Sequence, residues 1–189
     1  MIYLVLGLLL WSLVHMVPAV PMSVRTRLIE RTDLVVYKGI FAVLIAASVV
    51  LMVVGWKAGS DDLAFTPQAW GRGLNLVTML VASVLFLGPY IGSNVKRVIR
   101  HPQLTGVILW GLGHIIASGQ WRGVVLFGGL AVWALIEIAL LNRRDGAWEK
   151  PAPVSRMADF RLVVAGLMFF ALFMFTHKWL FGVAAIPEF

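Results

Sequence analysis

The feature that most constrains this sequence is a succession of long apolar stretches with few charged residues inside them. A helix that crosses a bilayer needs about 20 mainly apolar residues, and stretches near this length recur along the whole chain. Backbone polar groups in lipid must be satisfied within such a segment, which favours helices. We therefore expect an all-α, polytopic integral membrane protein that lies in a lipid bilayer.

About six transmembrane helices are predicted, packed in one bundle that forms a single domain over residues 1–189. The predicted spans cover residues 1–20, 34–56, 72–91, 103–118, 122–142 and 159–181. Residues 21–33 are expected to be a polar loop, and the fourth span is the shortest. The first span lacks a basic start and a cleavage site, so it is interpreted as a retained helix and not as a signal peptide.

Basic residues are distributed unequally between the two sides of these spans. With six crossings, 12 of the 16 Lys and Arg residues lie on the side that does not carry the termini. These are Arg25, Arg27, Arg31, Lys38, Lys96, Arg97, Arg100, Arg143, Arg144, Lys150, Arg156 and Arg161. Basic loops stay in the cytoplasm, so both termini are expected on the opposite, periplasmic side. This bias accounts for the net charge of +7, and we expect no nucleic-acid partner.

Histidine is the main candidate metal ligand, because the chain has no cysteine. The absence of cysteine excludes thiolate metal sites, covalent haem attachment and cysteine nucleophiles. A histidine within a membrane helix is costly and therefore indicates function. No nucleotide-binding glycine loop and no Ser-His-Asp pattern is visible in the sequence.

Two predicted spans carry the same pattern, in which glycine, tryptophan and histidine follow at intervals of four. Gly7 begins the first copy, which continues with Trp11 and His15, and the second copy ends with Trp110 and His114. This spacing places the three residues on one helix face. Imidazoles from two membrane helices can ligate haem b, so this spacing permits a flat cofactor between His15 and His114, with Trp11 and Trp110 packed near it. The alternative is two buried histidines that bond to neighbouring helices.

Other polar residues lie at the predicted membrane edges. Arg97, Arg100 and His101 precede the fourth span, where a helix N-terminus favours anions, and they are candidates for contact with haem propionates. The alternative for His101 is a helix-start residue in a basic loop. Glu137 is interpreted as a partner of nearby basic residues or as a proton-relay acid. His177 is interpreted as an interfacial anchor.

The chain resembles the NnrU family of bacterial inner-membrane proteins. The resemblance rests on the opening LLLWSLVHMVPA, the centre GPYIGSNVKRVIRHPQLTG, the following VILWGLGH and the segment NRRDG. The family is named for its association with nitrite and nitric oxide reduction. The resemblance implies an NnrU-like domain in the bacterial inner (cytoplasmic) membrane, a role in denitrification, and nitrite or nitric oxide reductase components as candidate partners.

The same core is similar to the 15-cis-zeta-carotene isomerases of plants and cyanobacteria. Those membrane enzymes hold haem b with histidines and isomerise a double bond. The resemblance implies His15 and His114 as iron ligands, and it matches His101 to the histidine of the RHP motif. It implies a haem-dependent isomerase or a redox protein that acts on a lipophilic small molecule, and it leaves open whether this chain is an enzyme.

Two further interpretations of function are kept. The RHPxxxG motif also resembles membrane methyltransferases that bind S-adenosylmethionine, and Arg100, His101 and Glu149 would then hold that cofactor. Leu104 replaces the usual tyrosine and residues 142–150 contain no glutamate pair, which counts against methyl transfer. The other interpretation is a non-enzymatic accessory factor for a respiratory reductase.

Overall fold

The computed structural model describes residues 1–19 and 22–185, and within these residues it contains helices and no strand. Residues 20 and 21 and the last four residues of the predicted domain lie outside this description. The helices are α1 (Ile2–Ala19), α2 (Met22–Thr32), α3 (Leu34–Lys57), α4 (Gly71–Leu87), α5 (Val95–Val98), α6 (Pro102–Ser118), α7 (Trp121–Asp145) and α8 (Arg156–Phe181). The all-α prediction is confirmed.

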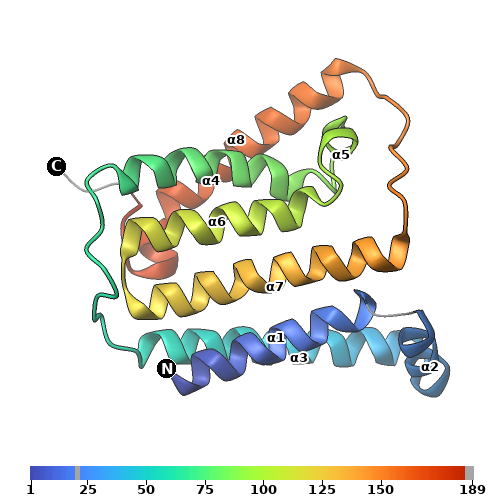
Figure 1. Cartoon of the computed structure of the whole chain (residues 1–189), viewed down its shortest axis with the longest axis horizontal. Helices are drawn as coiled ribbons and strands as arrows, with labels where there is room; N and C mark the ends of the chain where they lie inside the picture. The colour runs from blue at the N-terminus through green and yellow to red at the C-terminus, as the bar shows by residue number, and fades with distance from the viewer. Residues whose placement is uncertain (20–21, 186–189) are drawn as a thin grey trace.

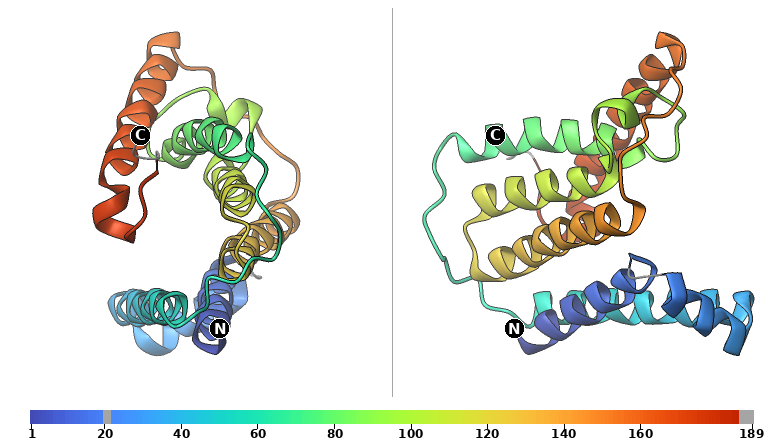
Figure 2. Two further views of the ribbon diagram at one scale, coloured as in Figure 1. Left: turned by 90° about the vertical axis from the view of Figure 1, so that its left-hand side faces the viewer. Right: turned by 45° about the vertical axis from the view of Figure 1, so that its right-hand side comes forward.

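The long helices form one curved row. α3 packs on α1, α1 on α7, α7 on α6, α6 on α4, and α4 on α8, as Figure 1 shows for the ribbons. Viewed along the helices, the row curls into an arc with α3 and α8 at its two ends (Figure 2, left). α7 therefore lies between α1 and α6, the two helices that carry the Gly-Trp-His patterns.

Glycines set the closest approaches between neighbouring helices in this row. A Cβ added to Gly55 of α3 would lie 2.6 Å from the Cα of Leu4 in α1. A Cβ added to Gly111 of α6 would lie 2.6 Å from the carbonyl oxygen of Phe127 in α7. Backbones can approach this closely only where a side chain is missing, which is how helices commonly pack in membranes.

Four helices, α1, α3, α7 and α8, are long and apolar enough to cross a membrane. Their bounds agree closely with four of the predicted spans. α4 and α6 have 17 residues each, and α4 ends before Gly88 and Pro89, where the predicted third span continued. The prediction of several membrane helices is confirmed, whereas six crossings and periplasmic termini stay predictions.

One expected loop is a helix. Residues 21–33 were expected to form a polar loop, but α2 occupies Met22–Thr32, and residue 21 lies outside the described residues. The segment is rich in arginine and also contains leucine and glutamate, which are all good helix formers, so its polarity does not prevent a helix. Asp33 then separates α2 from α3 with a φ of 78°, and its side chain accepts a hydrogen bond from Val35 N at 2.5 Å.

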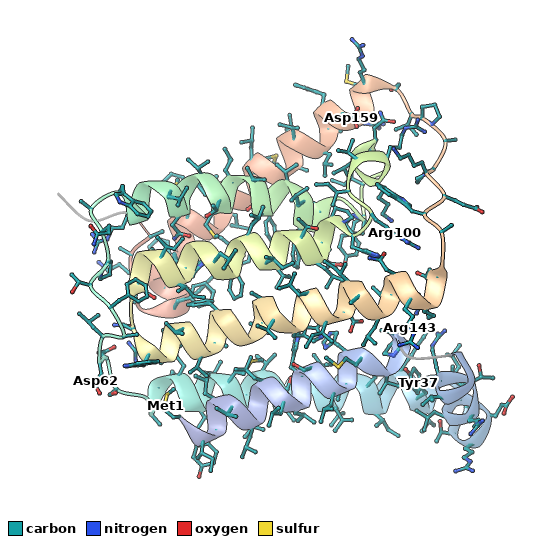
Figure 3. All side chains as sticks on the ribbon, in the orientation of Figure 1. Met1, Tyr37, Asp62, Arg100, Arg143 and Asp159 are labelled. Atoms are coloured by element: carbon teal, nitrogen blue, oxygen red, sulfur yellow. The ribbon has the colours of Figure 1, made fainter. Side chains whose placement is uncertain are left out.

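The connections between helices gather at two opposite ends of the row. At the loop end, defined here by residues 58–70 and 119–120, the amide of Ala64 donates to the carbonyl of Gly119 at 2.8 Å. The basic end comprises α2, α5 and the connection 146–155. Figure 3 shows Met1 and Asp62 at the loop end and Arg100 and Arg143 at the basic end. The basic residues expected in the cytoplasm lie in these elements or near the helix ends that adjoin them.

Candidate functional site

The two tryptophan–histidine pairs have the same local geometry on α1 and α6. His15 Nδ1 donates to the carbonyl of Trp11 at 3.0 Å, and His114 Nδ1 donates to the carbonyl of Trp110 at 2.9 Å. A carbonyl oxygen can only accept, so in the neutral ring Nδ1 carries the hydrogen and Nε2 keeps a free lone pair. The rings of each pair lie 4.1 Å and 5.1 Å apart. Both imidazoles therefore keep the Nε2 lone pair that a neutral imidazole uses to bind a metal.

The two histidines lie towards opposite ends of the row. His15 is four residues before Ala19, where α1 ends at the basic end, and His114 is four residues before Ser118, where α6 ends at the loop end. Within the described residues, the two imidazoles make no ring contact with each other. The ligation of one iron by both histidines stays a prediction.

Each histidine contacts a different aromatic residue of α7. The His15 ring lies 5.1 Å from the Trp133 ring, and the His114 ring lies 4.5 Å from the Phe127 ring. These two positions on α7 are six residues apart, which corresponds to about 9 Å along the helix axis. On its other side, His114 faces His177 of α8 with ring centres 6.4 Å apart. His177, interpreted from the sequence as an anchor, is thus the imidazole nearest to His114.

Buried polar atoms without a hydrogen-bond partner lie beside His15. They include the indole nitrogens of Trp11 and Trp133, which both contact the His15 ring, and one carboxyl oxygen of Glu137. Glu137 follows Trp133 by one turn of α7 and is 7% exposed. Each such atom costs about 1–3 kcal/mol when it stays unsatisfied. This region is therefore suited to the polar group of a bound molecule.

Glu137 does not form the ion pair that was one interpretation of it from the sequence. Within the described residues, no salt bridge involves Glu137, although the charge of Arg144 acts on it, and Arg144 pairs with Asp145 at 2.6 Å. Arg144 also donates to the carbonyl of Pro18 at 2.5 Å, which joins the end of α7 to the end of α1. The alternative, a carboxyl group with a functional role, stays a prediction.

The residues predicted to contact haem propionates lie at the basic end and bond to protein groups. Arg97 donates to the carbonyl of Pro151, and Arg100 donates to the carbonyl of Gly146 at 2.9 Å. The His101 ring bonds through Nε2 to the side-chain oxygen of an asparagine in α7 at 3.0 Å. These contacts hold the start of α6 against the connection between α7 and α8, which agrees with a structural role.

A polar cavity of about 480 Å³ lies beside these basic residues. It is lined by Lys96, Arg100, His101, Asp145, Ala147, Trp148, Glu149 and Pro151. The cavity brings together Arg100, His101 and Glu149, the three residues that the methyltransferase-like interpretation assigns to one cofactor. Their proximity depends on the fold, since α7 separates Glu149 from the RHP motif in the sequence.

This polar cavity lies far from His114 along α6. His101 precedes His114 by thirteen residues, which corresponds to about 20 Å along the helix. This separation exceeds the radius of a porphyrin. Arg100 and His101 could contact the propionates only of a haem whose iron lies near His15. For that position of the iron, these contacts stay a prediction.

Asn94 and Asp159 form a structural link that the sequence analysis did not identify. The backbone amide and the Nδ2 group of Asn94 donate to the two carboxylate oxygens of Asp159 at 2.7 and 2.8 Å. Asn94 also exchanges two hydrogen bonds with Val154, at 2.9 and 3.0 Å. The four bonds tie the segment before α5 to the start of α8. An acidic residue in the first turn of α8 was the only sequence signal of this link.

The comparison with protein families identifies the group to which the whole fold belongs. A family model described as NnrU protein matches residues 3–185. The chain belongs to the NnrU family. The match includes both Trp-His pairs of this NnrU family member and its RHP motif, so the resemblance predicted from the sequence is confirmed. No match was found among curated proteins or among solved structures.

Proposed function

We propose that this NnrU family member binds haem b within the membrane, with His114 as an axial ligand of the iron. The observation that carries the proposal is the hydrogen bond from His114 Nδ1 to the carbonyl of Trp110. It leaves Nε2 with a free lone pair, in an apolar helix, that can bind a metal. His15 has the same geometry and is the second candidate ligand. Histidine is the axial ligand of many haem proteins.

The side chains available as ligands support the binding of haem over that of a free metal ion. Within the described residues, no group of three or more His, Cys, Asp or Glu side chains could hold a metal, and zinc needs at least three protein ligands. A porphyrin supplies four nitrogen ligands itself, so one or two imidazoles complete the coordination of its iron. The tryptophans beside both histidines provide flat apolar surfaces for a macrocycle.

The chemistry that haem supplies when bound is one-electron transfer, or Lewis-acid catalysis at an open coordination position. The contribution of the chain is to fix each imidazole through its Trp carbonyl and to exclude water with apolar helices. The unsatisfied polar atoms beside His15 support the binding of a polar group of a lipophilic substrate. We therefore propose a redox or isomerase function on such a molecule, in support of denitrification as the NnrU resemblance implies.

The first test of this function is the haem content of the purified full chain. The pyridine haemochrome assay is expected to give about one haem b per wild-type chain, and His114→Ala is expected to lose haem or to become high-spin. Thr105→Ala is the matched control, because its hydroxyl bonds only to a carbonyl of the same helix, and it should keep its haem. A colourless wild type after expression with ample haem would refute the proposal.

The polar cavity supports a second candidate function, a methyltransferase-like activity on a lipid-phase acceptor. Arg100, His101 and Glu149 line the same cavity, and basic and acidic groups together suit the zwitterionic end of S-adenosylmethionine. Calorimetry with S-adenosylmethionine is expected to show binding that Glu149→Gln weakens. The absence of measurable binding to the wild type would exclude this function.

The proposed location is the bacterial inner membrane, with six crossings and both termini in the periplasm. α4 and α6 lie within the row of longer helices, and 17 residues span about 25 Å, close to the thickness of the hydrocarbon core. The chain has no cysteine, so single cysteines can be labelled without background. An impermeant maleimide should label Asp62→Cys but not Glu149→Cys in spheroplasts, and the reverse result would invert the topology.

A role as an accessory factor for a respiratory reductase is the remaining proposal, and it rests on the NnrU resemblance alone. Purification of the tagged chain from denitrifying cells is expected to enrich a nitrite or nitric oxide reductase subunit. Equal recovery of those subunits with an unrelated tagged membrane protein would contradict this role.

A further inference from the structure

The short helix α2 is tied closely to the ends of two long apolar helices. α1 ends at Ala19, α2 occupies Met22–Thr32, and α3 begins at Leu34. Both α1 and α3 are long and apolar enough to cross a membrane. α2 lies across their basic-end termini and does not run parallel to them (Figure 1; Figure 2, left). A helix held in this way between the ends of two membrane-crossing helices has to lie at the membrane surface, beside the lipid head groups.

One side of α2 combines exposed apolar and basic side chains. Val24 and Leu28 are 42% and 38% exposed, and they lie on the same side of the helix because they are four residues apart. Arg27 and Arg31 each follow one of them by three residues, so they form a neighbouring row. Arg25 precedes Leu28 by three residues and lies on its other flank. An apolar stripe flanked by arginines is typical of a helix that lies in the membrane interface.

The three arginines of α2 have no partner in the protein. Their side chains are exposed, and within the described residues none of them forms a salt bridge or a hydrogen bond with a protein group. Glu30 is the one acidic residue of α2, and it is two positions from Leu28, so it points away from the apolar stripe. The side of α2 that carries Leu28 therefore presents positive charge that no carboxylate of this helix neutralises.

Exposed guanidinium groups in this arrangement suit phosphate as a partner. Each guanidinium presents a planar fork of donors that matches the oxygens of a phosphate. Arg27 and Arg31 are one helical turn apart, so both can contact the same head group. Basic residues beside an apolar stripe also attract anionic lipids, because the stripe enters the acyl region while the charges stay at the head groups.

We propose that α2 is an interfacial helix that binds the head groups of anionic phospholipids through Arg25, Arg27 and Arg31. Val24 and Leu28 then lie against the acyl chains. This inference goes beyond the proposed function and does not depend on haem binding. It depends on α1 and α3 crossing the membrane, because they hold α2 at the surface.

The first test measures the depth of α2 in vesicles of phosphatidylcholine and phosphatidylglycerol. The chain has no cysteine, so a fluorophore can be attached to one introduced cysteine in the full chain. We expect lipids with brominated acyl chains to quench a label on Leu28→Cys strongly. A label on Thr26→Cys is the matched control and should be quenched little, because Thr26 is two positions from Leu28 and faces away from the membrane. Equal quenching of the two labels would overturn the proposed orientation.

The second test measures the binding of phosphatidylglycerol to the full chain in detergent by native mass spectrometry. The double variant Arg27→Gln/Arg31→Gln is expected to bind about 30-fold more weakly than the wild type, as expected for two basic residues at an anionic surface. Arg156→Gln/Arg161→Gln is the matched control, because it removes the same charge from exposed residues near the start of α8. It should weaken binding much less.

Equal losses of phosphatidylglycerol binding in the two double variants would overturn the assignment to α2, since any loss of positive charge would then have the same effect. The depth measurement keeps all three arginines of α2, so it tests the proposal even if the double variant does not fold. A wild type without haem would overturn the proposed function and leave this inference standing.

Discussion

Replacement of Gly55 by alanine tests the closest contact between α1 and α3. The added Cβ would lie 2.6 Å from the Cα of Leu4 and closer still to its backbone nitrogen, whereas ordinary contacts begin at 3.4 Å, so α1 would have to move by more than 0.8 Å. The clashing atoms are backbone atoms, which cannot rotate away. Leu4 is fully buried and belongs to the core cluster with Met52 and Trp133. Overpacking typically costs about 1–3 kcal/mol, and the upper value is expected here.

The assay is thermal unfolding in detergent, followed by tryptophan fluorescence, because Trp133 lies in the core. A loss of about 3 kcal/mol corresponds to a fall in the melting temperature of about 6–12 °C for a chain of this size. Gly39→Ala is the matched control on the same helix, since nothing lies within 4 Å of its added Cβ. It is expected to change stability by less than about 1 kcal/mol. Equal melting temperatures of the two variants would refute the close packing of α1 on α3.

Three further predictions use the same unfolding assay or limited proteolysis. Glu137→Gln should raise the melting temperature, because it replaces a buried carboxyl group, one oxygen of which has no hydrogen-bond partner, with an uncharged group; a lower melting temperature would indicate a partner in the folded protein. Asp159→Ala should speed proteolysis in the connection 146–155, since both carboxylate bonds to the α5 segment are lost, and unchanged cleavage would contradict this link. Arg122 of α7 forms an ion pair with Asp61, and its guanidinium also lies 4.5 Å from the Trp56 ring. Arg122→Ala should therefore destabilise more than Asp61→Asn, which should cost less than about 1 kcal/mol; equal losses would show that the ion pair alone matters.

The long helices could be predicted from the sequence because their apolar composition is a local property. The bounds of α3 and α8 agree with the predicted spans within a few residues. α2 could not be recognised in this way, since its arginines resemble those of an exposed loop and its helical state depends on backbone propensity. Hydropathy also could not show how α4 and α6 pack, because their glycine contacts are between segments far apart in the sequence.

The two Trp-His pairs could be predicted as local units because residues four apart always meet on one helix face. The hydrogen bond from each imidazole to the Trp carbonyl follows from the same spacing. The partner of each imidazole on other helices depends on the order of the row, which periodicity does not encode. His177 is an example, since its position near a helix end suggested an anchor, and only the crossing of α8 over α4 brings it to His114.

The position of α7 separates the two histidines into two environments. α1 runs from the loop end to the basic end and α6 runs in the opposite direction, so equivalent positions near their C-terminal ends lie at opposite depths of the row. His15 therefore lies near Trp133, which is one turn of α7 before the buried Glu137, whereas His114 lies near Phe127 and a second imidazole. The buried polar atoms without hydrogen-bond partners make the first environment the more suitable of the two for a polar group of a bound molecule. The α7 residues that contact the two histidines are six positions apart, so the two environments are separated by about 9 Å along α7.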